Sequence, residues 1–226
     1  MIAAKQQAAE RLYYLLGALF IAALITCNLI ANKFLTVDLG FYTFTLSAGV
    51  LPYPITFLIT DILSELYGRK RTTQVVLSGL VASIFVLFIL WLGAQFPATD
   101  NSPISDVQYN GVFQKAPKVI GASMLAYIVA QLIDVRLFHF WKNRTGGKKL
   151  WVRNNFSTMV SQLVDTVLVV IVLFIGTESW STMGEYIRDG WLFKVTAAAF
   201  DTAIIYAFMW WARRYFGLEM GEEIDV

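Results

Sequence analysis

Five acidic side chains lie inside the longest apolar runs of this chain, and their placement constrains the fold more than any other feature. They are Asp61, Glu65, Asp134, Asp165 and Asp201. A charged side chain at the centre of a membrane-spanning helix costs about 2.5–3.5 kcal/mol on insertion scales. A chain that keeps several such groups must provide water, polar partners or a ligand for them. The pattern therefore indicates a pocket or pathway through a membrane rather than a simple anchor.

The composition agrees with a membrane protein. Hydrophobic residues make up 57% of the 226 residues and charged residues only 15%, whereas a soluble domain carries roughly 25% charged residues. The 15% of aromatic residues is typical of a protein with aromatic belts at both membrane surfaces. The formal net charge of +2 is too small to indicate a nucleic-acid partner. The single cysteine, Cys27, excludes an internal disulfide and a cysteine-based metal site.

Six apolar segments have about the 20 residues that a helix needs to cross the bilayer core. We predict helices over residues 12–32, 47–67, 72–94, 119–141, 155–176 and 190–211. The longest connection, residues 95–118, leaves no room for a soluble domain. The predicted fold class is an all-α integral membrane protein, with residues 1–226 forming a single transmembrane domain of six helices.

Basic residues near the helix ends predict the orientation, because cytoplasmic loops carry an excess of lysine and arginine. With the N-terminus inside, twelve of the eighteen basic residues lie on the cytoplasmic side: Lys5, Arg11, Arg69, Lys70, Arg71, Lys142, Arg144, Lys148, Lys149, Arg153, Arg213 and Arg214. We therefore expect both termini in the cytoplasm and a multi-pass protein of the cytoplasmic (inner) membrane.

Polar residues recur along five of the six segments at the spacing of one helix face. These sets are Asn28 and Asn32; Asp61, Ser64 and Glu65; Tyr127, Gln131 and Asp134; Thr158, Ser161, Gln162 and Asp165; and Lys194 and Asp201. The segment 72–94 has no polar face beyond Ser78 and Ser83. We therefore expect that segment to be a peripheral helix that faces lipid.

Not every polar residue in these sets is expected to contact a ligand. Glu65 lies within a turn of the predicted inner surface, beside Arg69, so we expect a surface ion pair there. Asp165 is near mid-membrane and must face the interior. Lys194 either pairs with Asp165 or extends to the outer surface. Asn28 either ties two helices together or contacts a ligand.

Helix-breaking residues open the second segment. Gly49, Pro52 and Pro54 interrupt its backbone hydrogen bonds, so carbonyl groups there can face a cavity.

The polar faces together offer carboxylates and side-chain amides. A carboxylate accepts two parallel N–H bonds, which matches the ring N–H and exocyclic amino group on the edge of guanine, and an amide can meet a ring carbonyl. Tyr53, Phe57, Phe138 and Trp141 could cover the faces of a flat ring. The same carboxylates and amides could also bind protons, sodium or amines. With one histidine, no GxSxG and no glycine-rich phosphate loop, the chain shows no enzyme signature, no metal site and no need for a cofactor.

Three motifs carry a resemblance to a known family. They are TDILSELYG at residues 60–68, QLID at 131–134 and KKLWVRNNFSTMVSQLVDT at 148–166, preceded by Asn28. Together they resemble the queuosine precursor transporter family, also called the vitamin uptake transporter family, over nearly the whole chain. The resemblance implies six transmembrane helices and uptake of 7-cyano-7-deazaguanine (preQ0) for tRNA queuosine synthesis. The related 7-aminomethyl-7-deazaguanine (preQ1) is a second candidate substrate.

Carried over position by position, the family pattern is matched at Asn28, Asp61, Gln131, Asp134, Asp165 and Lys194. Glu65, Arg136, Gln162 and Asp201 lie outside that pattern. The expected substrate-binding residues are the six matched positions and Gln162, which shares the face of Asp165.

Three functions remain open at this point. The first is a secondary carrier that works alone or as a homodimer. The second is the substrate-binding subunit of an ATP-driven vitamin importer of the energy-coupling-factor type, for which Ala18 and Ala22 offer a small-residue docking face. The third, a membrane scaffold without transport, disagrees with the buried acidic residues.

Overall fold

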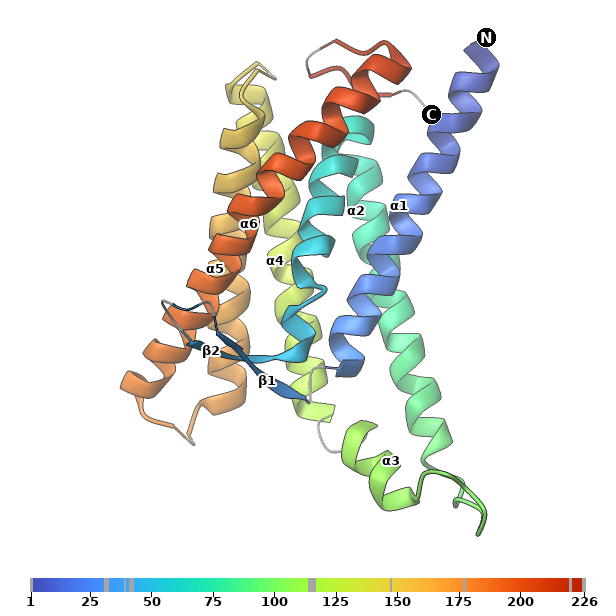
Figure 1. Cartoon of the computed structure of the whole chain (residues 1–226), viewed down its shortest axis with the longest axis vertical. Coiled ribbons are helices and arrows are strands. Elements are labelled where there is room, and N and C mark those ends of the chain that lie inside the picture. Colours follow the sequence, from blue (N-terminus) through green and yellow to red (C-terminus); the bar gives the residue numbers. More distant parts are fainter. Residues whose placement is uncertain are drawn as a thin grey trace.

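The computed structural model describes residues 2–30, 33–38, 40, 43–113, 117–146, 148–176, 178–219 and 221–224. Its long helices stand side by side in one bundle, and a short hairpin and a short helix lie toward the end opposite the two termini (Figure 1). The elements are α1 (Ile2–Ile30), β1 (Phe34–Asp38), β2 (Thr43–Ser47), a 3₁₀ turn (Ala48–Val50), α2 (Tyr53–Gly93), α3 (Asp106–Phe113), α4 (Pro117–Arg144), α5 (Leu150–Phe174) and α6 (Trp180–Phe216).

Five stretches within these elements are long and apolar enough to cross a membrane: Ala4–Ile30, Ala48–Gly93, Met124–Arg144, Leu150–Val172 and Trp180–Phe216. Large apolar side chains such as Tyr14, Phe85 and Phe200 are 61–73% exposed on the outside of the bundle. An apolar exterior of this kind is suited to lipid. The predicted helical membrane architecture is therefore confirmed.

The element α2 is two antiparallel limbs joined at Gly68. Its 41 residues would span about 60 Å as a straight helix, twice the bilayer core of about 30 Å. Gly68 instead has φ 75° and ψ 172°, a conformation open essentially to glycine alone. The first limb rises to this point and the second returns toward α3 (Figure 1). The limbs correspond to the predicted segments 47–67 and 72–94.

Small residues let α1 approach the second limb of α2. A Cβ atom at Gly79 would lie 2.8 Å from Phe20 Cε1, and one at Gly17 would lie 3.6 Å from a methyl group of Val75. The opposite side of this limb exposes Val81, Phe85 and other large apolar groups. This arrangement agrees with the expected peripheral, lipid-facing position of residues 72–94.

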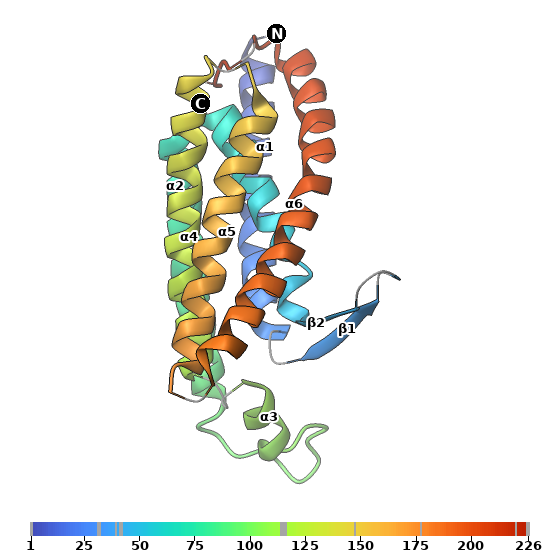
Figure 2. The same ribbon diagram turned by 90° about the vertical axis from the view of Figure 1, so that its left-hand side faces the viewer.

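The hairpin between α1 and α2 was not predicted. Strands β1 and β2 pair antiparallel, from Phe34 opposite Ser47 to Asp38 opposite Thr43. Their β-branched residues favour extended structure, and Asp38 Oδ1 accepts a hydrogen bond of 2.8 Å from Gly40 N in the turn. The hairpin projects from the bundle in the side view, and α3 lies beyond the helix ends (Figure 2). The hairpin is thus a small addition to the predicted all-α fold.

The helices also differ in extent from the predicted segments. Four begin earlier than predicted: α1 by ten residues, α4 by two, α5 by five and α6 by ten, whereas α2 begins later, after the 3₁₀ turn, at Tyr53. Hydropathy locates only the apolar centre of a helix, and a helix continues wherever polar residues sustain its hydrogen bonds. The predicted end of the first helix, at Asn32, lies outside the described residues.

Candidate functional site

A cavity of about 150 Å³ lies inside the bundle, where α1 ends and α2 begins. Five helices and the 3₁₀ turn contribute to its wall, through Leu24, Cys27, Asn28, Gly49, Val50, Tyr53, Tyr127, Asp165, Val169 and Lys194. Three of these residues (Asn28, Asp165 and Lys194) belong to the predicted set. We call this space the central cavity.

A buried ion pair forms the polar wall of the central cavity. Lys194 Nζ donates to Asp165 Oδ2 at 2.6 Å and to Thr166 Oγ1 at 3.2 Å. The side chains of Asp165 and Lys194 are only 4% and 12% exposed. Lys194 also lies 4.5 Å from the centre of the Tyr53 ring, within the range of a cation–π contact. Of the two alternatives for Lys194, the structure shows the counter-ion and not a side chain extended to the surface.

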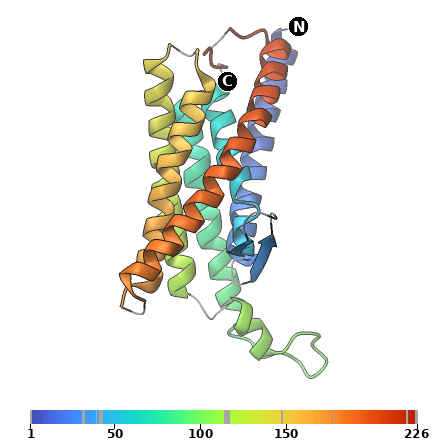
Figure 3. The same ribbon diagram turned by 60° about the vertical axis from the view of Figure 1, so that its left-hand side comes forward.

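Local packing on α5 and α6 brings this pair together. Asp165 follows Thr158, Ser161 and Gln162 along one face of α5, and all four residues are buried. At Gly190, a Cβ atom would lie 3.3 Å from Thr166 Cγ2, so the glycine allows a close approach. Trp191 Nε1 donates to Met159 O at 2.9 Å and joins α6 to α5. Helix α6 runs obliquely across the bundle (Figure 3).

The broken start of α2 supplies another part of the wall. Gly49 and Val50 belong to the 3₁₀ turn before α2 and line the central cavity. Residues of the helix-breaking stretch thus line the cavity, and the exposure of their carbonyl groups to it stays a prediction. Leu24 and Val169 also line the cavity, and no motif or polar spacing pointed to them.

Aromatic rings adjoin the ion pair. Tyr53 and Tyr127 meet edge to face, with ring centres 5.8 Å apart, and Tyr53 and Phe57 lie 5.5 Å apart. Phe57 lines a small recess next to the central cavity, together with Gln162, Asp201 and other residues. Phe138 and Trp141, also expected to cover a ring, lie elsewhere. Arg153 lies 5.6 Å from the Phe138 ring centre, and Trp141 packs on Phe156.

The remaining predicted site residues form a second polar group deeper in the bundle. Asp61, Gln131 and Asp134 are at most 2% exposed, and none lines the central cavity or its recess. Ser161 Oγ donates to Asp134 Oδ1 at 2.9 Å, and the carboxyl groups of Asp61 and Asp134 face each other. Polar atoms of Gln131 and Gln162 find no partner of good hydrogen-bond geometry among the described residues. These groups thus keep capacity for further hydrogen bonds.

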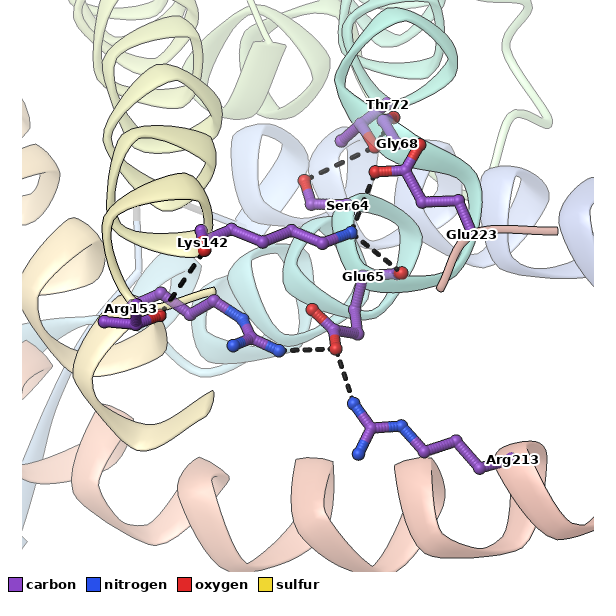
Figure 4. Close-up of polar contacts among 9 residues, drawn as sticks. Ser64, Glu65, Gly68, Thr72, Lys142, Arg153, Arg213 and Glu223 are labelled. Carbon is purple, nitrogen blue, oxygen red and sulfur yellow. Dashed lines mark hydrogen bonds and ion pairs between the residues drawn. The ribbon is translucent and has the colours of Figure 1, made fainter. Parts of the chain in front are cut away.

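A third polar group, which we call the ion cluster, lies near the end of the bundle that carries the termini. Glu65 Oε1 accepts from Arg153 Nη2 and, at 2.6 Å, from Arg213 Nη2 (Figure 4). Glu65 and Arg153 are 1% and 0% exposed. The expectation of a surface ion pair between Glu65 and Arg69 is therefore wrong. The chain reverses at Gly68, so Arg69 is exposed while Glu65 faces the interior.

The sequence predicts both partners of Glu65, Arg153 and Arg213, on the cytoplasmic side of the membrane. Arg153 falls before the predicted helix 155–176, but α5 begins at Leu150 and holds Arg153 inside the bundle. A usable signal was present, because a buried carboxylate requires a buried cation. Arg153 and Arg213 lie at the cytoplasmic ends of the predicted segments 155–176 and 190–211. Glu65 lies near the same membrane surface, so both arginines were candidate partners.

The C-terminal tail packs against the ion cluster. Lys142 Nζ donates to Glu223 Oε1 at 2.8 Å and to the backbone oxygen of Glu65 at 3.4 Å. Ile224 N donates to Leu66 O at 2.6 Å. Figure 4 shows Glu223 reaching the Gly68 turn from the tail. Residues from α2, α4, α5, α6 and the tail thus meet at this end of the bundle.

Most of the chain is similar to known membrane transporters. Residues 47–208 match the family described as "Putative vitamin uptake transporter". The chain is 32% identical over 171 residues to the "Probable queuosine precursor transporter" of Bacillus subtilis, covering 75% of this chain and 69% of that protein. It is 19% identical to the "Queuosine precursor transporter" of Escherichia coli, over 68% of this chain and 63% of that protein. No solved structure matches the chain significantly.

Proposed function

This chain belongs to the vitamin uptake transporter family, and we propose that it carries queuosine precursors of the 7-deazaguanine class across the cytoplasmic membrane. The observation that supports this function most strongly is the central cavity with the Asp165–Lys194 pair and two tyrosines in its wall. Names of relatives supply the substrate class: two matched proteins, from B. subtilis and E. coli, are named queuosine precursor transporters. The motif-based prediction of the family is confirmed by the family match.

The chemistry of the central cavity suits a deazaguanine. Asp165 can accept the ring N–H and amino group of the guanine-like edge, because a carboxylate has two acceptor oxygens. Asn28 Nδ2 has no hydrogen-bond partner among the described residues and can donate to the ring carbonyl. Tyr53 and Tyr127 offer ring surfaces for a flat base. We propose preQ0 as substrate, with preQ1 as the second candidate.

The deeper polar group belongs to the same proposal. Asp61, Gln131, Asp134 and Gln162 stay predicted substrate contacts. In the described structure only Gln162 adjoins the central cavity, through the recess. A base that moves deeper along α4 and α5 during transport would meet the other three. The unused hydrogen-bond capacity of Gln131 supports such a path.

We further propose six transmembrane spans with both termini in the cytoplasm. The two limbs of α2 supply the second and third spans. Both ends of the chain lie at the same end of the bundle (Figure 1), and the last turns of α4 and α6, which carry Lys142, Arg144, Arg213 and Arg214, lie there too. A homodimer stays a prediction. The energy-coupling-factor alternative gains no support, because the matched relatives are named as transporters.

Uptake by purified protein tests the proposal directly. Proteoliposomes that contain only this chain should accumulate labelled preQ0 without ATP or another protein. Adenine lacks the paired N–H donors, and each acceptor left unpaired costs about 1–3 kcal/mol. Excess adenine should therefore inhibit uptake at least about tenfold more weakly than unlabelled preQ0 or preQ1. Equal inhibition by adenine would refute recognition of the guanine edge, and absence of uptake would refute the independent carrier.

A further inference from the structure

A second, larger cavity opens at the end of α6, apart from the central cavity. It has a volume of about 500 Å³ and lies between the start of α5, at Leu150, and about the last three turns of α6. The volume is many times the share of one water, roughly 30 Å³, so the space admits a sizeable group. We call it the terminal cavity.

The charged side chains in the wall of the terminal cavity are all positive. Among the residues in its wall, Arg213 and Arg214 are basic and none is acidic. Leu150 is the first residue of α5; Lys149 before it makes no side-chain cap, and Tyr206 Oη accepts a hydrogen bond of 3.2 Å from Trp151 N. The positive end of the α5 dipole therefore adds to the same field. The cavity is suited to an anion.

Arg213 lines this cavity and also belongs to the ion cluster. Its contact with Glu65 occupies only part of the guanidinium group. Arg213 donates through Nη2 to Glu65 at 2.6 Å, and its side chain is 22% exposed. Figure 4 shows the guanidinium directed from α6 toward Glu65. A guanidinium has five N–H donors. Glu65 also serves Arg153, so one carboxylate faces two guanidinium groups, and a second anion beside Arg213 would improve the local balance of charge.

The surroundings identify the anion as part of a lipid. Trp210 lines the cavity and is 66% exposed, and its neighbours Trp211 and Tyr215 are 46% and 47% exposed. Exposed tryptophan and tyrosine at the end of a membrane-length helix are typical of the headgroup level. Arg214 lies 5.8 Å from the Trp210 ring. The cavity thus combines arginines for a phosphate with an apolar, aromatic side for a chain.

We propose that the terminal cavity binds the phosphate headgroup of an anionic phospholipid, held by Arg213 and Arg214 against Trp210. This site is separate from the substrate path and does not depend on the proposed cargo. The headgroup would add a negative charge next to the Glu65–Arg213 contact, where α2 and α6 are joined.

Trp210 makes the site measurable by fluorescence. The full-length protein is reconstituted in phosphatidylcholine vesicles that contain a small, equal fraction of either brominated phosphatidylglycerol or brominated phosphatidylcholine. Bromine quenches nearby tryptophan, so the wild-type protein should be quenched more by the anionic lipid. Trp210→Phe should reduce this excess because it removes the one of the seven tryptophans that lines the cavity. Arg214→Gln should weaken the apparent lipid affinity by about tenfold, the scale of one charge-assisted hydrogen bond.

Arg144→Gln is the matched control, because Arg144 is an exposed arginine at the end of α4 and does not line the terminal cavity. It should keep the excess quenching. Equal loss in Arg144→Gln and Arg214→Gln would mean general surface attraction and would overturn the site. Equal quenching of wild-type protein by the two lipids would overturn it as well. Removal of the excess by millimolar inorganic phosphate, at constant ionic strength, would reassign the cavity to a free anion.

Discussion

Lys194 and Asp165 show at the scale of single residues how this chain keeps charges inside an apolar bundle. Their contact of 2.6 Å offsets the cost of burying either group alone, which is several kcal/mol. Glu65 follows the same rule with two arginines. The two carboxylates differ in position, because Asp165 borders the central cavity whereas Glu65 lies in the ion cluster. We therefore expect substitution of Asp165 to lower substrate uptake and substitution of Glu65 to lower the stability of the fold.

Asp165→Asn should lower preQ0 uptake by at least about tenfold, because it removes a charge-assisted acceptor worth about 1.5–3 kcal/mol. It should also lower the thermal midpoint, since Lys194 loses its partner. Adding Lys194→Met should restore the midpoint but not the uptake. Initial rates in proteoliposomes measure the uptake, and thermal unfolding in detergent measures the midpoint. Ser78→Ala, on the exposed side of α2, is the control. Wild-type uptake by Asp165→Asn would remove Asp165 from the site.

Glu65→Gln should lower the free energy of unfolding by about 3–5 kcal/mol, since it leaves the buried Arg153 and the half-buried Arg213 without their carboxylate. Glu185→Gln, an exposed change on α6, should alter it by no more than about 0.5 kcal/mol. Denaturant unfolding in mixed micelles compares the two variants. Similar shifts would show that the Glu65 contacts contribute no more than a surface charge.

At the scale of elements, the reversal of α2 decides which helices meet. Gly68 turns the chain so that Ser64 Oγ lies 3.4 Å from Thr72 Oγ1 on the returning limb. The same turn leaves Glu65 facing α5 and α6 and carries Arg69 outward. Apolar periodicity predicted both limbs of α2 because it is a local property. It could not predict the partners of Glu65, because these depend on the direction of the turn.

Gly68→Ala tests this element. A non-glycine residue at φ 75° and ψ 172° should cost about 1–3 kcal/mol, and the added Cβ atom would also collide with the Glu223 carboxylate. Gly184→Ala, at a helical position with open space around it, should be neutral or stabilising, because alanine favours a helix by about 0.5–1 kcal/mol over glycine. Equal thermal midpoints for the two variants would contradict the requirement for glycine at position 68.

At the scale of the whole molecule, the two ends of the chain and the polar connection between α2 and α4 lie at opposite ends of the bundle (Figure 1). A reporter fused after Val226 should behave as cytoplasmic, and one inserted after Asn101, in the exposed connection before α3, should behave as external. A paired phosphatase and fluorescent-protein fusion series distinguishes the two sides. The opposite pattern would reverse the proposed orientation while leaving the fold unchanged.

The apolar helices, their polar faces and the family could be predicted from the sequence, because hydropathy, helical spacing and short motifs are local properties. The sequence also singled out Asp165 as an interior group. The pairing of the charges, by contrast, follows from how the helices pack. Asp165 and Lys194 are 29 residues apart, and Glu65 is 88 and 148 residues from its two arginines. Such contacts depend on how each helix is rotated and on the reversal at Gly68, and no local pattern of residues contains that information.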